Sequence, residues 1–247
     1  MKSNFTAVIL AAGKGTRLNC TKENKVVKKL ADKPMISYTT DLLKKINIKS
    51  IIVVIGYAQE SVKQILGDKY IYALQKKPLG TGNAVLSALS SLPQTCQHVL
   101  VLNADDSAFY QPEDLDQLIN THLKNKADMS LLTVIKDNPK KLGRIIRDQN
   151  KKVSAIVEYK NATEQQRKIK EVNTATYCFT KEFLQACLPQ VKPNPVSHEY
   201  YLTDLLAIAV KNNKQVIAVK LSQSSRFQGV NTKEDLQLAD KKMKQKN

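Results

Sequence analysis

The sequence is poor in aromatic residues and lacks any hydrophobic run of membrane-spanning length. Aromatic residues make up 6% of the 247 residues, and there is no Trp. They are not interleaved with basic residues in the manner of modules that stack RNA bases. The hydrophobic runs stay below the ~18 residues of a transmembrane helix, and the first residues lack the layout of a secretory signal. We therefore expect a cytoplasmic protein that binds neither nucleic acid nor membrane.

Cysteines are also few and widely separated, at positions 20, 96, 178 and 187. No two of them form a Cys-x-x-Cys pair, and no Cys and His residues follow the spacing of a zinc cluster. The pattern predicts four free thiols, as in a reducing compartment.

Negative charge is in deficit, with 39 Lys and Arg against 22 Asp and Glu, for a net charge of +17. Such a balance suits nucleic acid, an acidic membrane surface or a small anionic substrate. Because the basic residues are spread along the whole chain, we favour a small anionic substrate. The alternative of a basic nucleic-acid-binding module would show itself in salt-dependent retention of RNA or DNA.

In the first half of the chain, short apolar runs alternate with segments of helical spacing. The runs predict strands over 5–11, 50–55, 70–74 and 98–102, and the spacing predicts helices over 35–46, 58–66 and 82–92. This alternation is typical of an α/β fold: a Rossmann-like, mostly parallel sheet flanked by helices. In such sheets a ligand binds at the carboxyl edge of the strands.

The second half changes pattern after a helix predicted over 112–124. Strand-like runs cover 129–135, 143–147, 153–158 and 172–179. They predict a mixed β extension that folds back over the sheet as a lid. Further elements are expected at 181–187, 200–211, 215–221 and 232–244. No linker or repeat divides the chain, so we expect a single domain over 1–247.

Glycine is scarce, yet four of the eight glycines form two pairs, Gly13/Gly15 and Gly80/Gly82. Each pair follows a predicted strand, where glycine lets backbone N–H groups approach an anion. The first loop, Leu10-Ala-Ala-Gly-Lys-Gly-Thr-Arg-Leu18, adds two cations and a hydroxyl. It lacks the P-loop pattern, and Leu18 stands where the dinucleotide fingerprint requires a third glycine. A phosphate cradle of another kind is indicated.

Seven motifs occur in the order and spacing of one family. They are the 10–18 loop with Lys25 and Lys-Pro-Met at 33–35, Gln75-x-x-x-x-Gly-Thr-Gly-Asn-Ala84, Gly143-Arg-Ile145, the 156–167 segment, Glu171-Val-Asn-Thr174, Glu199-Tyr-Tyr-Leu-Thr-Asp204 and Gly229-Val-Asn231. Over roughly residues 8–240 the sequence resembles the sugar-1-phosphate nucleotidylyltransferases. In detail it resembles the N-terminal pyrophosphorylase domain of bacterial N-acetylglucosamine-1-phosphate uridylyltransferases.

The resemblance implies that UTP and N-acetylglucosamine 1-phosphate react in line at the α-phosphorus to give UDP-N-acetylglucosamine and pyrophosphate. The attacking phosphate oxygen is already an anion, so the protein needs no nucleophile of its own. The implied organisation is a nucleotide-binding half (1–127), a sugar-binding half (128–231) and a C-terminal helix with a basic tail (232–247). The β-helix acetyltransferase domain of the bifunctional family is absent from this sequence, so we expect a monomer without acetyltransferase activity.

Matching the family motifs residue by residue implies the roles at the nucleotide side. Arg17 would bind the β- and γ-phosphates, and Lys25 would lie near the α-phosphate and the attacking oxygen, as the two catalytic cations. The remaining positions are implied to bind the nucleotide, with the last three reading the uracil edge: Leu10, Ala11, Ala12, Gly13, Gly15, Thr16, Gln75, Gly80 and Thr81.

The same matching implies a Mg²⁺ site and a sugar site. Asp105 and Asn231 would hold Mg²⁺, with Asp106 as the competing carboxylate, and few protein oxygens are typical of Mg²⁺ sites. The sugar side is implied to contain Asn103, Gly143, Glu158, Asn173 and Thr203.

The sequence departs from the family pattern at two places. Asn103-Ala104 stands where the family usually has Tyr-Gly before the metal Asp, and Asn24 stands where it usually has Pro before Lys25. A related transferase for another sugar 1-phosphate therefore stays open as an alternative. A second alternative is a catalytically silent nucleotide-sugar sensor, which the loss of Arg17, Lys25 or Asp105 would favour; all three are present.

Overall fold

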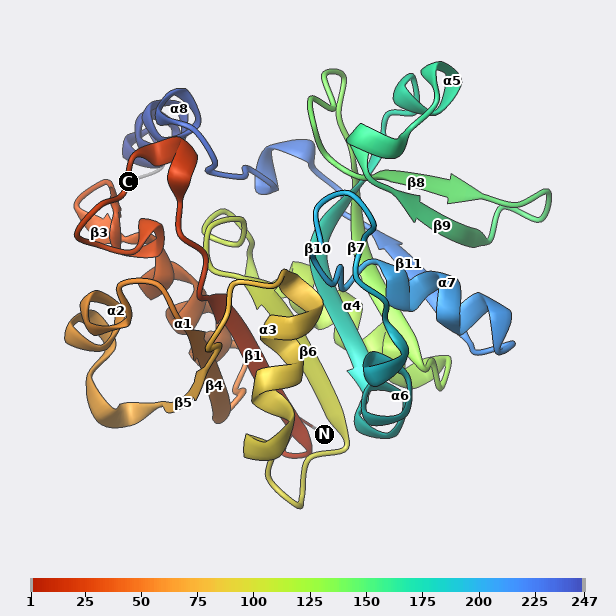
Figure 1. Ribbon diagram of the computed structural model, residues 1–247, viewed down its shortest axis with the longest axis horizontal. Coiled ribbons are helices and arrows are strands. Elements are labelled where there is room, and N and C mark those ends of the chain that lie inside the picture. Colours follow the sequence, from red (N-terminus) through yellow and green to blue (C-terminus); the bar gives the residue numbers. More distant parts are fainter. Residues whose placement is uncertain (1, 246–247) are drawn as a thin grey trace.

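The computed structural model describes residues 2–245, and its N-terminal half builds the parallel part of a central sheet (Figure 1). Strand β1 (Phe5–Ala11) lies in the middle and pairs in parallel with β4 (Ser50–Ile55) and β6 (His98–Asn103), while β5 (Ile71–Leu74) pairs with β4. All seven residues of β1 are buried. Burial on both faces is why this strand is an unbroken apolar run.

The second half continues the same sheet. The strand order of the nine-stranded sheet is β11-β7-β10-β6-β1-β4-β5, and β8 and β9 branch from β10. These strands are β7 (Met129–Ile135), β8 (Arg144–Arg147), β9 (Val153–Val157), β10 (Glu171–Thr180) and β11 (Val216–Lys220). The expectation that the whole extension folds back over the sheet is wrong. Strands β7, β10 and β11 extend the sheet itself, and β7 and β10 are buried along most of their length. Only the β8–β9 hairpin branches off the main strand order, through the pairing of β8 with β10.

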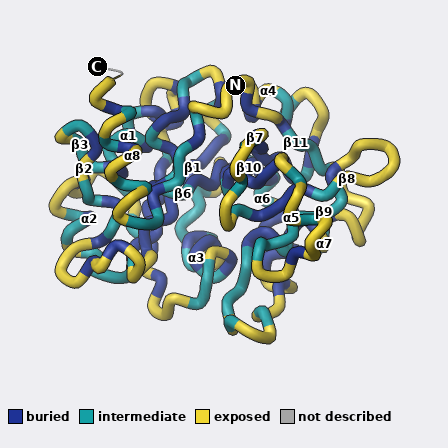
Figure 2. Tube along the Cα trace, turned by 90° about the horizontal axis from the view of Figure 1, so that it is seen from above, coloured by how far each residue is buried: buried dark blue, intermediate teal, exposed yellow. Residues whose placement is uncertain are grey.

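Helices cover both faces of the sheet, and the side chains of β1 alternate between two cores. Phe5 and Ile9 join the core that includes residues of α1, α2 and α4, whereas Val8 joins the core that includes residues of α3, α6 and α7. Figure 2 shows the buried segments gathered at the centre and the exposed ones at the periphery. The helices are α1 (Met35–Lys45), α2 (Gln59–Leu66), α3 (Thr81–Ala88), α4 (Pro112–Lys124), α5 (Glu164–Arg167), α6 (Lys181–Cys187), α7 (Asp204–Lys211) and α8 (Lys233–Lys244).

Short elements connect these helices and strands. A two-stranded ribbon pairs β2 (Lys29–Leu30) with β3 (Lys33–Pro34). It adjoins a third apolar cluster that also contains Ala239 and Met243 of α8. The 3-10 turns are η1 (Thr16–Leu18), η2 (Lys25–Val27), η3 (Gly67–Lys69), η4 (Leu89–Ser91), η5 (Tyr159–Asn161), η6 (Leu188–Gln190) and η7 (Ser224–Arg226). Within residues 2–245, no helix is both long and apolar enough to cross a membrane.

Two helix predictions are wrong at one end. The helix expected over 200–211 begins only at Asp204, because the preceding residues bond to the loop before α3: the N–H of Tyr200 donates to the carbonyl of Leu79 over 2.8 Å. Helix α3 ends at Ala88 and passes into η4, short of the predicted end at 92. The four cysteines are buried free thiols, as predicted.

Candidate active site

The loop after β1 presents backbone N–H groups at the carboxyl edge of the sheet. Gly15 has φ 61, and a Cβ there would lie 2.9 Å from the Cβ of Lys25, so only glycine fits. Among the described residues, no protein acceptor receives a hydrogen bond from the backbone N–H of Gly13, Lys14 or Gly15. Successive N–H groups of this kind form a concave surface that suits an anion.

Next to this loop, one cation and two oxygen-bearing side chains from distant segments form a cluster. Asp105 follows β6, whose last residue, Asn103, pairs with Leu10 of β1. The N–H of Val230 donates to the carbonyl of Asp105 over 3.2 Å, which brings the 229–231 segment alongside. The ammonium of Lys25 forms an ion pair with the Asp105 carboxylate and donates to Oδ1 of Asn231 over 3.3 Å.

The cluster is largely shielded from solvent. The side chains of Lys25 and Asp105 are 16% and 11% exposed. Burial alone would lower the pKa of Lys25, but the Asp105 carboxylate outweighs it, and the pKa is raised. Lys25 is therefore held charged at neutral pH.

The neighbouring carboxylates are not equivalent. Asp106 accepts a hydrogen bond from Nδ2 of Asn103 over 3.2 Å, and it lies against Gly229, where a Cβ would come within 2.8 Å of Oδ1. Burial and the adjacent Asp105 carboxylate raise the pKa of Asp106 to about 7. Asp105 is the one that contacts Lys25, whereas Asp106 packs under the 229–231 segment. Asn103, expected at the sugar, has its amide engaged with Asp106.

A second group of the expected residues lies around Gln75 and Gly80. The amide of Gln75 donates to the carbonyl of Gly80 over 3.0 Å and to Oδ1 of Asn83 over 2.9 Å. Gly80 has φ 96, and a Cβ there would lie 2.7 Å from the carbonyl oxygen of Tyr200. The hydroxyl of Thr81 accepts from the N–H of residue 202 over 3.0 Å. These contacts join the 75–81 loop to the segment that carries Thr203.

Four of the five residues expected at the sugar lie together. A Cβ on Gly143 would come within 3.4 Å of Oε1 of Glu158, and the carbonyl of Gly143 accepts from the N–H of Asn173 over 2.9 Å. Burial and Asp204 raise the pKa of Glu158, against a hydrogen bond from Thr203. The side-chain amide of Asn173 donates to the hydroxyl of residue 177 over 2.6 Å, which fixes its orientation.

Arg17 points into a basic cavity of about 840 Å³ that opens beside Asn231. Its other cationic lining residues are Lys136, Lys140, Lys141, Arg144 and Arg167, and its acidic ones are Glu234 and Asp235. Lys140 lies at the exposed edge of this cavity, where it pairs with Asp235 of α8 at 3.0 Å.

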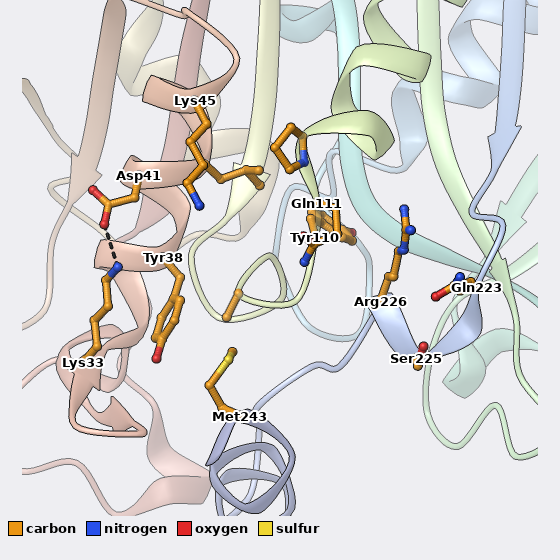
Figure 3. A pocket seen from close by; sticks show the side chains of 13 residues that line it. Lys33, Tyr38, Asp41, Lys45, Tyr110, Gln111, Gln223, Ser225, Arg226 and Met243 are labelled. Atoms are coloured by element: carbon orange, nitrogen blue, oxygen red, sulfur yellow. Dashed lines mark hydrogen bonds and ion pairs between the residues drawn. The ribbon is translucent and has the colours of Figure 1, made fainter. Parts of the chain in front are cut away.

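A smaller cavity, of about 530 Å³, lies away from these groups between α1, η7 and α8 (Figure 3). None of the expected site residues lines it. Two of its three cationic lining residues are already paired: Lys33 with Asp41 at 2.6 Å, and Arg226 with the buried Asp114 at 2.9 Å. The geometry therefore favours the Lys25–Asp105 side of the molecule as the active site.

Asn24 is a buried residue whose part in the site the sequence did not show. It is 0% exposed, and its amide donates to carbonyls of the 11–15 loop. The only sequence signal was an amide residue in place of the usual Pro before Lys25.

Comparison with known proteins shows the family of the chain. A family model described as nucleotidyl transferase matches residues 6–227. The chain belongs to the nucleotidyl transferase family. The bifunctional protein GlmU of Heliobacterium modesticaldum is 41% identical over 235 residues, which cover 95% of this chain and 50% of that protein. The bifunctional protein GlmU of Geobacillus sp. (strain WCH70) is 39% identical over 240 residues, covering 97% and 52%. The chain thus spans about half the length of these curated relatives.

Solved structures of nucleotidyl transferases share the fold. A putative glucose-1-phosphate thymidylyltransferase from Bacillus anthracis matches with a TM-score of 0.83 at 21% identity, over 98% of this chain and 96% of that one. A UDP-glucose pyrophosphorylase complexed with UDP-glucose matches with a TM-score of 0.79 at 21% identity, over the full length of both. The predicted α/β fold, with a mostly parallel sheet between helices, is confirmed.

Proposed function

We propose that the protein transfers a uridylyl group from UTP to N-acetylglucosamine 1-phosphate and releases pyrophosphate. The observation that carries the proposal is the contact of Lys25 with both Asp105 and Asn231, next to a loop of unpaired backbone N–H groups. It is supported by the family membership and by the similarity to the GlmU proteins. Two anionic substrates require such a combination of cations and donors.

In the proposed mechanism, a phosphate oxygen of the sugar phosphate attacks the α-phosphorus of UTP, and the bond to the β-phosphate bridging oxygen breaks. The chain's own residues align the two anions and offset their charge, which is the main catalytic demand of phosphoryl-type transfer. Lys25 would contact the α-phosphate and the attacking oxygen, and Arg17 the β- and γ-phosphates. The N–H groups of the 12–16 loop would hold the nucleotide in place.

The donor set near Lys25 also fits Mg²⁺. Asp105 and Asn231 offer a carboxylate and an amide oxygen, the hard ligands that Mg²⁺ prefers. The ammonium of Lys25 already bonds to both, which shows that the place suits a positive charge. We propose that these two residues hold Mg²⁺, which when bound would neutralise phosphate charge.

The remaining groups of the site would select the substrates. We propose that Gln75, with Gly80 and Thr81, reads the uracil edge, because an amide and backbone groups offer both donors and acceptors. We propose that Gly143, Glu158, Asn173 and Thr203 surround the sugar. The division into halves at residues 1–127 and 128–231, the cytoplasmic location and the monomeric state stay predictions.

A second candidate is transfer to a different sugar 1-phosphate. The amide of Asn103 is bonded to Asp106, so the stacking ring that the family resemblance implies here is replaced by a group with another contact. This change bears on the sugar and leaves the nucleotide loop and the cation cluster as they are.

The test is a pyrophosphate-release panel that crosses UTP, CTP, GTP, ATP and dTTP with several sugar 1-phosphates, with Mg²⁺ or EDTA. We expect the highest kcat/KM with UTP and N-acetylglucosamine 1-phosphate, and no turnover with EDTA. A preference for glucose 1-phosphate or for dTTP would favour the second candidate. Nucleotide binding without turnover of any pair would refute both and favour a sensor.

A further inference from the structure

We propose that Asn24 is a positioning residue that holds the anion-binding loop in shape and aims Lys25 at Asp105. The inference deepens the proposed function and rests on it. It starts from burial: the Asn24 side chain is 0% exposed, and a buried amide is costly unless its donors and acceptor are satisfied.

The amide of Asn24 ties together segments that are distant in sequence. Its Nδ2 donates to the carbonyls of Ala11, Gly13 and Tyr57 over 2.9, 3.3 and 2.8 Å. The N–H of Tyr57 in turn donates to the carbonyl of Ala12 over 3.2 Å. The anion-binding loop is thus held by hydrogen bonds to Asn24 and to Tyr57, which lies in the segment after β4.

This bracing decides which way the loop's N–H groups point. In a planar trans peptide, the N–H lies opposite to the C=O. Because the carbonyls of Ala11 and Gly13 point at Asn24, the N–H groups of Ala12 and Lys14 point away from it. One buried amide therefore turns the donors of the loop outward, where an anion can meet them.

The same residue fixes the turn that carries Lys25. Asn24 is the N-cap of η2 (Lys25–Val27): its Oδ1 accepts from the N–H of Val26 over 3.1 Å. Its own N–H donates to the hydroxyl of Ser61 over 3.0 Å. The backbone and the side chain of Asn24 thus both hold the start of η2, from which the side chain of Lys25 extends to Asp105.

The backbone of Asn24 supplies a rescue variant. Its φ is −70, close to the value that proline imposes through its ring. Asn24→Pro would fix φ at the start of the turn through its ring, but it removes both the side-chain amide and the N–H that donates to Ser61. Asn24→Ala removes only the side-chain amide. Thr21→Ala is the matched control, because Thr21 is exposed in the same loop and only its carbonyl is engaged there.

One measurement in the test does not depend on catalysis. It can therefore disprove the role of Asn24 without bearing on the proposed function. Hydrogen–deuterium exchange on the free proteins should show faster exchange at residues 18–28 and 57–61 in Asn24→Ala than in wild type. It should show no change in Thr21→Ala. Exchange in Asn24→Ala that equals wild type would overturn the bracing role whatever the substrate proves to be.

The kinetic arm separates positioning from general stability. We expect Asn24→Ala to lower kcat/KM for UTP roughly ten- to a hundredfold, through both kcat and KM, with KM for the sugar phosphate within about twofold. Asn24→Pro should recover at least about half of the lost kcat. A fall in kcat with every KM unchanged and a lowered Tm would show a merely structural role and overturn the proposal. An Asn24→Pro variant whose KM for UTP returned to the wild-type value would also overturn it, because the ring cannot bond the carbonyls of Ala11 and Gly13.

Discussion

Replacing Lys25 by alanine should change stability and catalysis in ways that separate the two roles of its ammonium. In the free protein, this ammonium pairs with Asp105, and the two side chains are 16% and 11% exposed. Removing one partner of a buried pair costs about 3–5 kcal/mol, and the residual exposure reduces this to about 2–4 kcal/mol. For a chain of this size, each 1 kcal/mol shifts Tm by about 2–4 °C. We therefore expect Tm in EDTA to fall by roughly 4–16 °C.

Mg²⁺ should reverse part of that loss. The ion must compete with the ammonium for Asp105 and Asn231 in the wild type, but not in Lys25→Ala. Because a ligand that binds the folded state more tightly stabilises it more at the same concentration, the rise in Tm on adding Mg²⁺ should be larger in the variant. Mg²⁺ should not restore catalysis in the variant. Loss of a charge-assisted contact of about 1.5–3 kcal/mol in the transition state lowers kcat roughly ten- to a hundredfold.

The assays are thermal unfolding in EDTA and in Mg²⁺, and steady-state pyrophosphate release at saturating UTP. Lys22→Ala is the control, since Lys22 is an exposed cation in the same loop and should leave Tm and kcat near wild type. A Lys25→Ala variant that keeps its kcat and changes only KM would refute the transition-state role. A Tm in EDTA equal to that of the wild type would refute the structural reasoning.

Three further predictions concern the base loop, the carboxylate pair and acid stability. Gly80→Ala should raise KM for UTP at least roughly fivefold, because φ is 96 and the Cβ would lie 2.7 Å from a facing backbone oxygen; Gly67→Ala, with φ 65 and open space around it, should not. Asp105→Asn should lower kcat at least about tenfold more than Asp106→Asn, since only Asp105 contacts the cation; equal losses would contradict the assignment. Burial lowers the pKa of His122 from 6.5 to about 4. Between pH 6.5 and 4 the unfolded state binds a proton at His122 that the folded state does not. The free energy of unfolding should therefore fall by up to about 3 kcal/mol from this residue over that range, and His122→Gln should lack this contribution.

The parallel part of the fold was predictable because each strand is defined by its own residues. The run Phe5–Ala11 is buried throughout, and such a run predicts a central strand without knowledge of its partners. The positions of β7, β10 and β11 were not predictable in the same way. Their place in the sheet depends on pairing across long stretches of chain, such as Tyr177 with Val101, which short-range periodicity does not contain.

At the site, the sequence motifs predicted which segments lie near one another, but they did not predict the contacts between their side chains. The Asp105–Lys25 pair joins residues 80 positions apart. The helix predicted from residue 200 begins later because tertiary hydrogen bonds override local helical spacing: the N–H of Tyr200 donates to the carbonyl of Leu79, and its carbonyl accepts from the N–H of Gly82. Asn24 was noted only as a departure, because its acceptors lie 11 to 33 residues away.

If this site joins a uridylyl group to a sugar phosphate, the protein must also catalyse the reverse reaction. The wild-type protein would be incubated with UDP-N-acetylglucosamine, Mg²⁺ and radiolabelled pyrophosphate. We expect labelled UTP, with the label confined to the β- and γ-phosphates, and no labelled UTP in EDTA or with Asp105→Ala. Saturable binding of UDP-N-acetylglucosamine without any labelled UTP would contradict it.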